Sequence, residues 1–346
     1  MTKVVAALAA ITMTFWAGTA LAGDQAIVDR GASTVVYEQY GLEVIPSQVW
    51  YDTDHVTAAV GLRNRLGGGI ELSGAPTSCN AAEGVILHWS FTGIDNPAQP
   101  DLDKIRILRV TPPGPYHWQV IQGEVVGESD VNCWEFNSKA RVYRKVLTAE
   151  ERTALGFDTV VNGTFAVALM PGTTSILAGR DPWDDDGYND NLAAADGVAI
   201  TAVYHASCCQ AEMGKTMLFD AAVGGYDGLA GKLFNTSASY MLHGLEVAEN
   251  SDSKFTFISF GGQASQGGRV QGVMASESML IDGVDASGLG SYATRFYDGA
   301  AGSTSPQLMD ARSINQPLTA DQSDVTIEIF GDKDCIVPGA VILTSK

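Results

Sequence analysis

The chain has 346 residues, a length that predicts two domains or one large β domain at roughly 100 to 200 residues per domain. Hydrophobic residues make up 45% of the sequence and charged residues only 18%, which excludes an intrinsically disordered chain and a coiled coil. The formal net charge of −19 opposes the broad basic footprint that a nucleic-acid binder needs. We therefore expect a folded protein with no nucleic-acid partner.

Residues 1–22 have the pattern of a secretory signal peptide. Lys3 supplies the positive charge, residues 4–16 are apolar, and Ala20-Leu21-Ala22 forms a small-residue cleavage signal. A membrane anchor is the alternative, but the apolar stretch is short and interrupted by threonines, whereas spanning needs about 20 apolar residues. The sequence thus predicts an exported protein (extracellular, cell-surface or periplasmic) whose mature chain starts at Gly23 and has no transmembrane segment.

Short β-type segments separated by Gly, Pro, Asn and Asp dominate the mature chain. The alternation is clearest in the last of them, where Val325, Ile327 and Ile329 fall on one face of a half-buried strand. In chain order, the predicted strands are Thr34–Tyr37, Val85–Trp89, Ile105–Val110, Arg141–Tyr143, Thr164–Met170, Val198–Tyr204, Phe255–Phe260, Val270–Met274 and Val325–Phe330.

One short helix is predicted over Leu147–Leu155, because Thr148 followed by Glu151 has the spacing of a capping box. The polar stretch 179–196 is the most plausible domain boundary. The fold class predicted is all-β: two antiparallel β-sandwich or jelly-roll modules, residues 23–196 and 197–346, with one short helix.

Five cysteines in an exported chain predict disulfide bonds: Cys79, Cys133, Cys208, Cys209 and Cys335. With one module in each half, we expect Cys79 to pair with Cys133, and Cys335 with Cys208 or Cys209. A strained bond between the adjacent Cys208 and Cys209, or an intermolecular bond, are the alternatives.

An acidic loop over residues 181–191 is the densest cluster of metal-ligating residue types. Asp184, Asp186 and Asp190 surround Gly187, and calcium takes six to eight oxygen ligands of this kind. The loop departs from the EF-hand pattern, since Ala195 stands at the twelfth position counted from Asp184. Calcium is therefore the possible cofactor, and a solvated turn between modules is the alternative.

Aromatic residues in predicted loops are candidate stacking platforms for a sugar or a partner protein: Tyr116, Trp118, Trp183 and Tyr188. By contrast, Trp89, Trp134, Phe255 and Phe257 lie in or beside strand-like segments, so we expect them in the core.

Catalytic motifs are not found in the sequence: it lacks a Walker loop, a dinucleotide-binding glycine pattern, a His-Glu-x-x-His helix and a correctly spaced nucleophile elbow. We expect a noncatalytic exported protein of cell-surface structure, adhesion or assembly, with a surface glycan, a surface protein or a second copy as partner. A carbohydrate-binding module and a secreted hydrolase with an unrecognised carboxylate pair are the alternatives.

Overall fold

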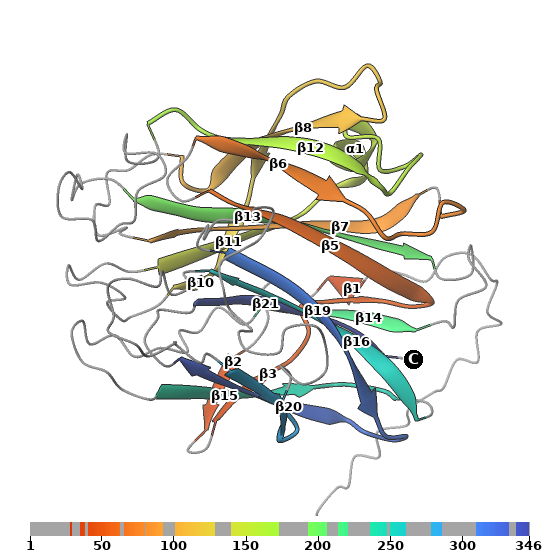
Figure 1. Cartoon of the computed structure of the whole chain (residues 1–346), viewed down its shortest axis with the longest axis vertical. Coiled ribbons are helices and arrows are strands. Elements are labelled where there is room, and N and C mark those ends of the chain that lie inside the picture. The colour runs from red at the N-terminus through yellow and green to blue at the C-terminus, as the bar shows by residue number, and fades with distance from the viewer. Residues whose placement is uncertain are drawn as a thin grey trace, which may run out of the picture.

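The structure is a computed structural model that describes residues 28–29, 35–38, 41–62, 66–79, 81–92, 101–128, 140–172, 193–205, 214–220, 236–247, 250–260, 278–285, 309–331 and 337–345. It is nearly all β, and its described strands form four sheets, called D, C, A and B here, stacked in that order from top to bottom in Figure 1. Adjacent strands pair antiparallel, except that β3 (Gly41–Val44) pairs parallel with β15 (Thr236–His243).

The two upper layers of Figure 1 are sheets D and C. Sheet D has the order β6 (Gly67–Leu72), β12 (Gly163–Leu169), β8 (Lys104–Thr111) and β9 (Gln119–Gln122). Sheet C has the order β10 (Glu124–Glu128), β11 (Ala140–Val146), β7 (Ala82–Thr92), β13 (Ala194–His205) and β5 (Thr53–Gly61).

The two lower layers are sheets A and B. Sheet A has the order β1 (Val28–Asp29), β4 (Gln48–Trp50), β14 (Lys215–Asp220), β21 (Val337–Ser345), β16 (Ser251–Phe260) and β19 (Met309–Leu318). Sheet B has the order β18 (Val284–Asp285), β17 (Ser278–Ile281), β20 (Asp324–Gly331), β15, β3 and β2 (Val35–Glu38).

The predicted all-β class of antiparallel sandwiches with one short helix is confirmed. The predicted strands within the described residues all overlap observed ones, and Val270–Met274 lies outside the described residues. The helix is α1 (Ala149–Ala154), and its capping box forms as expected: the Thr148 hydroxyl accepts from the Glu151 N–H at 3.2 Å, and the Glu151 carboxylate accepts from the Thr148 N–H at 2.7 Å.

Each sandwich has its own apolar core. Between D and C, Ile107 and Phe165 pack with Trp89, which is fully buried and whose indole N–H donates to the Leu102 carbonyl at 2.9 Å. Between A and B, Phe255 packs in one core with Ile327. The expected burial of Trp89, Phe255 and Phe257 is confirmed, and Trp134 lies outside the described residues.

A third apolar core joins the two inner sheets, C and A. Strand β7 shows why its sequence is nearly continuous in apolar residues: Leu87 and Trp89 face the core shared with sheet D, whereas Ile86 faces sheet A. Strand β21 has the same property, because Leu343 faces sheet B and Ile342 faces sheet C. Strands that are buried on both faces need apolar residues at successive positions.

The chain passes from the lower sandwich to the upper one and returns. Residues 53–205 supply the described strands of sheets C and D, and the strands of residues 28–50 join those of residues 215–345 in sheets A and B. The predicted boundary at residues 196 and 197 therefore falls inside β13, which pairs with β5 and β7 along its length. The sheets do not divide at that point because β13 is a central strand of the upper sandwich.

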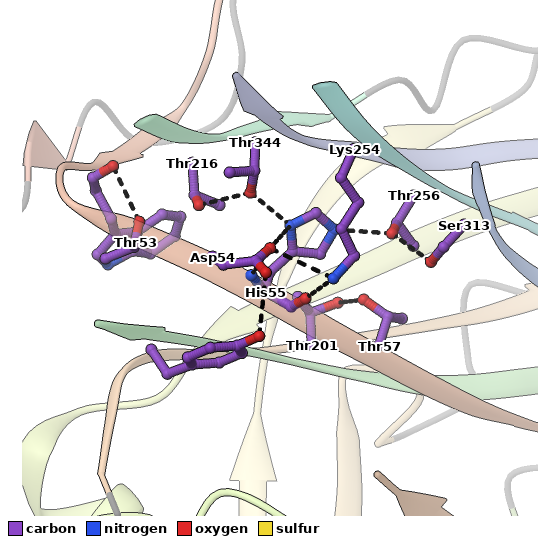
Figure 2. A network of polar contacts seen from close by, with 12 residues as sticks. Thr53, Asp54, His55, Thr57, Thr201, Thr216, Lys254, Thr256, Ser313 and Thr344 are labelled. Carbon is purple, nitrogen blue, oxygen red and sulfur yellow. Dashed lines mark hydrogen bonds and ion pairs between the residues drawn. The ribbon is translucent and has the colours of Figure 1, made fainter. Parts of the chain in front are cut away.

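A buried network of hydroxyl groups around His55 crosses the contact between sheets C and A (Figure 2). His55 of β5 is fully buried, and its Nδ1 and Nε2 lie 2.8 Å from the Thr344 hydroxyl and 2.7 Å from the Thr256 hydroxyl. Those hydroxyls bond onward to Thr216 at 2.8 Å and to Ser313 at 2.7 Å. A neutral imidazole has one N–H and one acceptor nitrogen, and each threonine hydroxyl can fill either role.

A second polar cluster crosses the same contact. The Arg144 guanidinium of β11 donates to the Asp220 carboxylate of β14 at 2.6 Å, and both side chains are only 1% exposed. Arg144 also donates to the Ser47 hydroxyl at 2.6 Å and to the Glu124 carboxylate. Burial lowers the pKa of the neighbouring His88, although the nearby Asp220 opposes that shift.

We expect Asp220→Ala to lower the free energy of unfolding by about 3 to 5 kcal/mol, since it leaves the Arg144 charge buried without this partner. Denaturant unfolding measures the change. Asp252→Ala removes an exposed carboxylate of sheet A and should change stability by no more than about 0.5 kcal/mol. A loss below about 1 kcal/mol for Asp220→Ala would contradict this expectation and would show that Ser47 and Glu124 suffice as partners of Arg144.

The stability should also fall as the pH falls. Burial and the nearby Lys254 lower the pKa of His55 from 6.5 to about 3, against the opposing charge of Asp54. The unfolded chain then binds a proton that the folded chain does not, so this stabilisation is complete above pH 6.5 and is lost as the pH falls toward 3. The loss is up to about 1.4 kcal/mol per pH unit, or about 2 kcal/mol at pH 5.

Denaturant unfolding at pH 8 and at pH 5 checks this expectation. His55→Gln removes the titrating group and should reduce the difference between the two pH values by about 2 kcal/mol. Thr256→Val disturbs the same network without removing the imidazole, so it should lower stability at both pH values and keep the difference. An unchanged difference in His55→Gln would contradict the expectation. His88, whose pKa is lowered as well, adds to the remaining slope.

Candidate binding surface

Several residues that the sequence singles out lie outside the described residues. They are the calcium candidates Asp184, Asp186 and Asp190, the aromatic candidates Trp183 and Tyr188, and the cysteines Cys133, Cys208, Cys209 and Cys335. Within the described residues, no group of three or more His, Cys, Asp and Glu side chains could hold a metal ion. The same part of the chain contains no helix of the length and hydropathy that a membrane crossing requires.

The two buried polar clusters have no access for a substrate. His55, Thr256 and Thr344 are fully buried, and both ring nitrogens of His55 already bond to hydroxyl groups. Arg144 and Asp220 are equally enclosed. These groups therefore hold sheet C on sheet A, and a functional site has to be sought on the surface.

The outer face of sheet D is the surface that differs most from an ordinary solvated sheet. Along β8, Ile105 and Ile107 point into the core, so Arg106, Leu108 and Val110 point outward. The outer face of sheet D is defined by the following residues: Arg106, Leu108, Val110, Trp118, Val120, Ala166 and Ala168. Three of these are large apolar side chains with high exposure: Val120 (55%), Val110 (47%) and Trp118 (46%).

The strand register places these side chains next to one another. Arg106 lies between Val120 of β9 and Ala168 of β12. One step along, Leu108 lies opposite Ala166, which in turn lies opposite Gly69 of β6. Small residues on β12 and β6 leave this part of the sheet low and flat, whereas the large side chains gather over β8 and β9.

Trp118 immediately precedes β9, and the Arg106 guanidinium lies 5.6 Å from the centre of its ring. This contact is a cation–π interaction, which holds the indole and the guanidinium in a fixed relation. The predicted exposure of an aromatic side chain from this loop is thus observed at Trp118.

Tyr116, the other aromatic candidate of this loop, has an anchoring position. Its ring packs against Gly114 and Gly156, where a Cβ atom would lie 2.5 Å and 2.4 Å from ring or hydroxyl atoms of Tyr116. The ring also lies 5.9 Å from the Arg109 guanidinium. Tyr116 therefore ties the loop that precedes Trp118 to the turn that follows α1.

Arg109, on the core-facing side of β8, holds the turn that follows α1 in place. It is 2% exposed and donates to the carbonyl groups of Leu155 at 2.5 Å, Val160 at 2.9 Å and Asn162 at 3.0 Å. The rings of Phe157 and Phe165 flank it. Burial lowers the pKa of Arg109 to about 10, so the guanidinium stays charged at neutral pH. The outer face of sheet D thus rests on an ordered support.

The sequence interpretation missed Arg106, Leu108, Val110, Val120, Ala166 and Ala168. Ile105–Val110 and Thr164–Met170 were recognised as strands, and alternation places these residues opposite the core-facing ones. The sequence did contain one sign of an apolar outer face: β8 carries apolar residues on both of its faces, with Leu108 next to Ile107. That signal also fits a strand of an inner sheet, so the sequence alone does not show which face is open.

Cys79 is disulfide-bonded, and its partner lies outside the described residues. Its Sγ lies 3.7 Å from the His205 carbonyl oxygen, at the end of β7 where Ala82 pairs with Tyr204. Cys133 follows the last residue of β10, Glu128, in the sequence. Glu128 pairs with Arg141 of β11, and Arg141 pairs with Phe91, which lies at the opposite end of β7 from Ala82.

These two ends of β7 are roughly 30 Å apart, at about 3.3 Å per residue. Cys133 reaches at most about 17 Å from Glu128. The Cys79–Cys133 pair stays a prediction, since Cys133 lies outside the described residues. From the reach of the chain alone we expect Cys208 or Cys209, which follow His205 closely in the sequence, as the partner of Cys79.

Non-reducing peptide mapping of the alkylated mature protein should link the peptide that contains Cys79 to the peptide that contains Cys208 and Cys209. The bond should disappear on reduction. A link from Cys79 to the Cys133 peptide would show that the reach estimated from the strands is wrong.

Comparisons with known proteins give no family: no family model matches the chain, and no curated protein matches it. Among solved structures, the chain is similar to dimeric latent PorU from Porphyromonas gingivalis, with a TM-score of 0.25 and 8% identity over 78% of this chain and 24% of that one. It is also similar to the insecticidal delta-endotoxin Cry8Ea1 from Bacillus thuringiensis, with a TM-score of 0.21 and 10% identity over 85% of this chain and 52% of that one. The chain thus spans about a quarter and about half of these two proteins, and its function has to be argued from its own residues.

Proposed function

We propose that this chain is a noncatalytic exported protein of cell-surface structure, adhesion or assembly, and that the outer face of sheet D is its interaction surface. Export is supported by the signal-peptide pattern of residues 1–22. The observation that carries the proposal is the exposure of Val110, Trp118 and Val120 on one face of one sheet. Exposed apolar side chains gathered on one face of a folded protein favour that face as a site of interaction.

The other outermost layer, sheet B, shows what an ordinary solvated face of this protein contains. On β20, Thr326 and Glu328 alternate with buried residues, and the His243 ring lies within hydrogen-bonding distance of the Asp324 carboxylate. Met241 lies opposite Thr326 on the neighbouring strand. This face mixes charged, hydroxyl and apolar side chains. The outer face of sheet D also carries polar side chains, Lys104, Gln122 and Glu71 among them, but Val110, Trp118 and Val120 are each about half exposed beside them. The difference favours sheet D as the face that contacts a partner.

A carbohydrate-binding module is the second candidate, and Trp118 is the observation that favours it. An exposed indole offers an apolar ring surface with a polar N–H at its edge, which suits stacking against a sugar. A binding module of this kind is compatible with a surface or adhesive role, since a glycan can be the surface that is recognised.

The test compares retention of the mature protein on cells of the producing organism with that of Leu108→Ser combined with Val120→Ser. We expect the double variant to lose at least about tenfold in apparent affinity, equivalent to about 1.4 kcal/mol, because it removes apolar contact area from the centre of the surface. Val284→Ser, at a 45% exposed valine on sheet B, is the matched control and should bind like the wild type.

Electron microscopy of the same preparations shows whether the retained protein is assembled or dispersed. Equal retention of the double variant and the wild type would contradict the proposed surface. Turnover of a polysaccharide or peptide panel by the wild type would contradict the noncatalytic role.

A further inference from the structure

We propose that the outer face of sheet D binds an acidic polysaccharide, with Arg106 and Trp118 as the pair that recognises a sugar carboxylate and its ring. This inference rests on the proposed function, since it names the partner of the same surface.

Arg106 differs from the other arginines within the described residues in the partner of its guanidinium. Those other arginines each have an oxygen partner, as follows: Arg109 with backbone carbonyls, Arg141 with Glu128, Arg144 with Asp220 and Glu124, Arg152 with the Leu147 carbonyl, and Arg312 with Asp310. The contact of Arg106 is the Trp118 ring, and its Nε is buried without a hydrogen-bond partner. Nε is therefore closed to a ligand, and the two terminal amino groups, Nη1 and Nη2, are the donors that remain for an anion.

The groups around Arg106 do not supply that anion. Its nearest cross-strand neighbours, Val120 and Ala168, are apolar. The nearby acidic residues are engaged elsewhere: Asp101 accepts from Lys104 at 2.6 Å, and Asp103 accepts from the Gln122 amide at 2.7 Å. A guanidinium in an apolar setting without a counter-charge favours a ligand that brings a carboxylate or sulfate, which it can bind through two parallel hydrogen bonds.

Trp118 and the low surface beside it favour a sugar as the carrier of that anion. The Arg106 guanidinium lies over one face of the 46% exposed indole, so a pyranose ring would stack its C–H face on the other face, and its acidic group would reach the guanidinium past the edge of the ring. Ala166, Ala168 and Gly69 keep the sheet low next to this pair, so an extended polymer can continue across it. An acidic peptide would carry its carboxylates on flexible side chains without the flat ring that the indole fits.

The overall charge of −19 is compatible with an anionic ligand when the ionic strength is high enough to screen that charge. Charges farther away than about 8 Å are largely screened at physiological ionic strength, so the local guanidinium decides binding there. A nucleic acid would need many phosphate contacts, and this face offers few cations. At low salt, by contrast, the net negative charge of the protein repels the polymer.

The experiment measures binding of the mature protein to polygalacturonate and to fully methyl-esterified homogalacturonan of the same length, which lacks the carboxylates. We expect binding to the acidic polymer and at least tenfold weaker binding to the ester. Arg106→Gln and Trp118→Ala should each weaken binding to the acidic polymer about tenfold or more, and Arg106→Lys should restore only part of the affinity.

Arg141→Gln is the matched control, because it makes the same change in net charge at an arginine that is paired with Glu128 on sheet C. It should leave binding unchanged. Equal loss in Arg141→Gln and Arg106→Gln would overturn the inference, since a diffuse charge effect would then explain both. Equal binding of the acidic and the esterified polymer would also overturn it.

The outcomes separate this inference from the proposed function. If neither polymer binds, but Leu108→Ser with Val120→Ser still loses retention on cells, the surface has a partner other than an acidic polysaccharide of this kind, and the inference is wrong while the proposed function stands. If that double variant is retained like the wild type, the outer face of sheet D is not the interaction surface, and the proposed function is wrong on that point whether or not the polymers bind.

Discussion

The contact between sheets C and A is the constraint on which the rest of the structure depends. Each of these sheets already has one face in its own sandwich, so joining them buries both faces of both sheets. Apolar or hydrogen-bonded side chains are therefore favoured at the contact, because an unpaired polar group there is costly. His55 is a neutral imidazole between two threonine hydroxyls, and the charge of Arg144 is compensated by Asp220. Polar groups inside the molecule are therefore used to hold layers together.

The same contact explains the path of the chain. Strands β1 to β4 lie in sheets A and B with strands from the second half, and the upper sandwich is built from the residues in between. Each sandwich depends on the other, because an isolated lower sandwich would expose Ile342 and Phe260, and an isolated upper one would expose Ile86 and Val142. Apolar burial of this extent favours unfolding of the four layers as one cooperative unit.

Much of this architecture could be predicted from the sequence, and the remainder has a definite physical reason. Alternation in Val325–Phe330 predicted a half-buried strand, and β20 does lie in an outermost sheet. The boundary at residue 196 was placed by loop composition, which does not report that β13 pairs with β5 far earlier in the chain. Pairing between distant strands depends on the whole fold. For the surface, Trp118 was predicted from its loop, whereas Arg106 was missed because an arginine in a strand gives no sign of whether an acid lies beside it.

The position of the proposed surface follows from the layer order. An inner sheet has no open face, and an outermost sheet has one, so a binding surface built on a sheet face has to lie on D or B. Sheet D has a rigid support, since Arg109 ties the strand below Trp118 to three carbonyl groups, and Tyr116 packs the preceding loop on Gly156. Side chains that are ordered before binding lose little conformational entropy when a ligand arrives. The paired charges inside the molecule thus contribute to stability, whereas the guanidinium of Arg106 on the outer face of sheet D is the group to which we assign the proposed recognition.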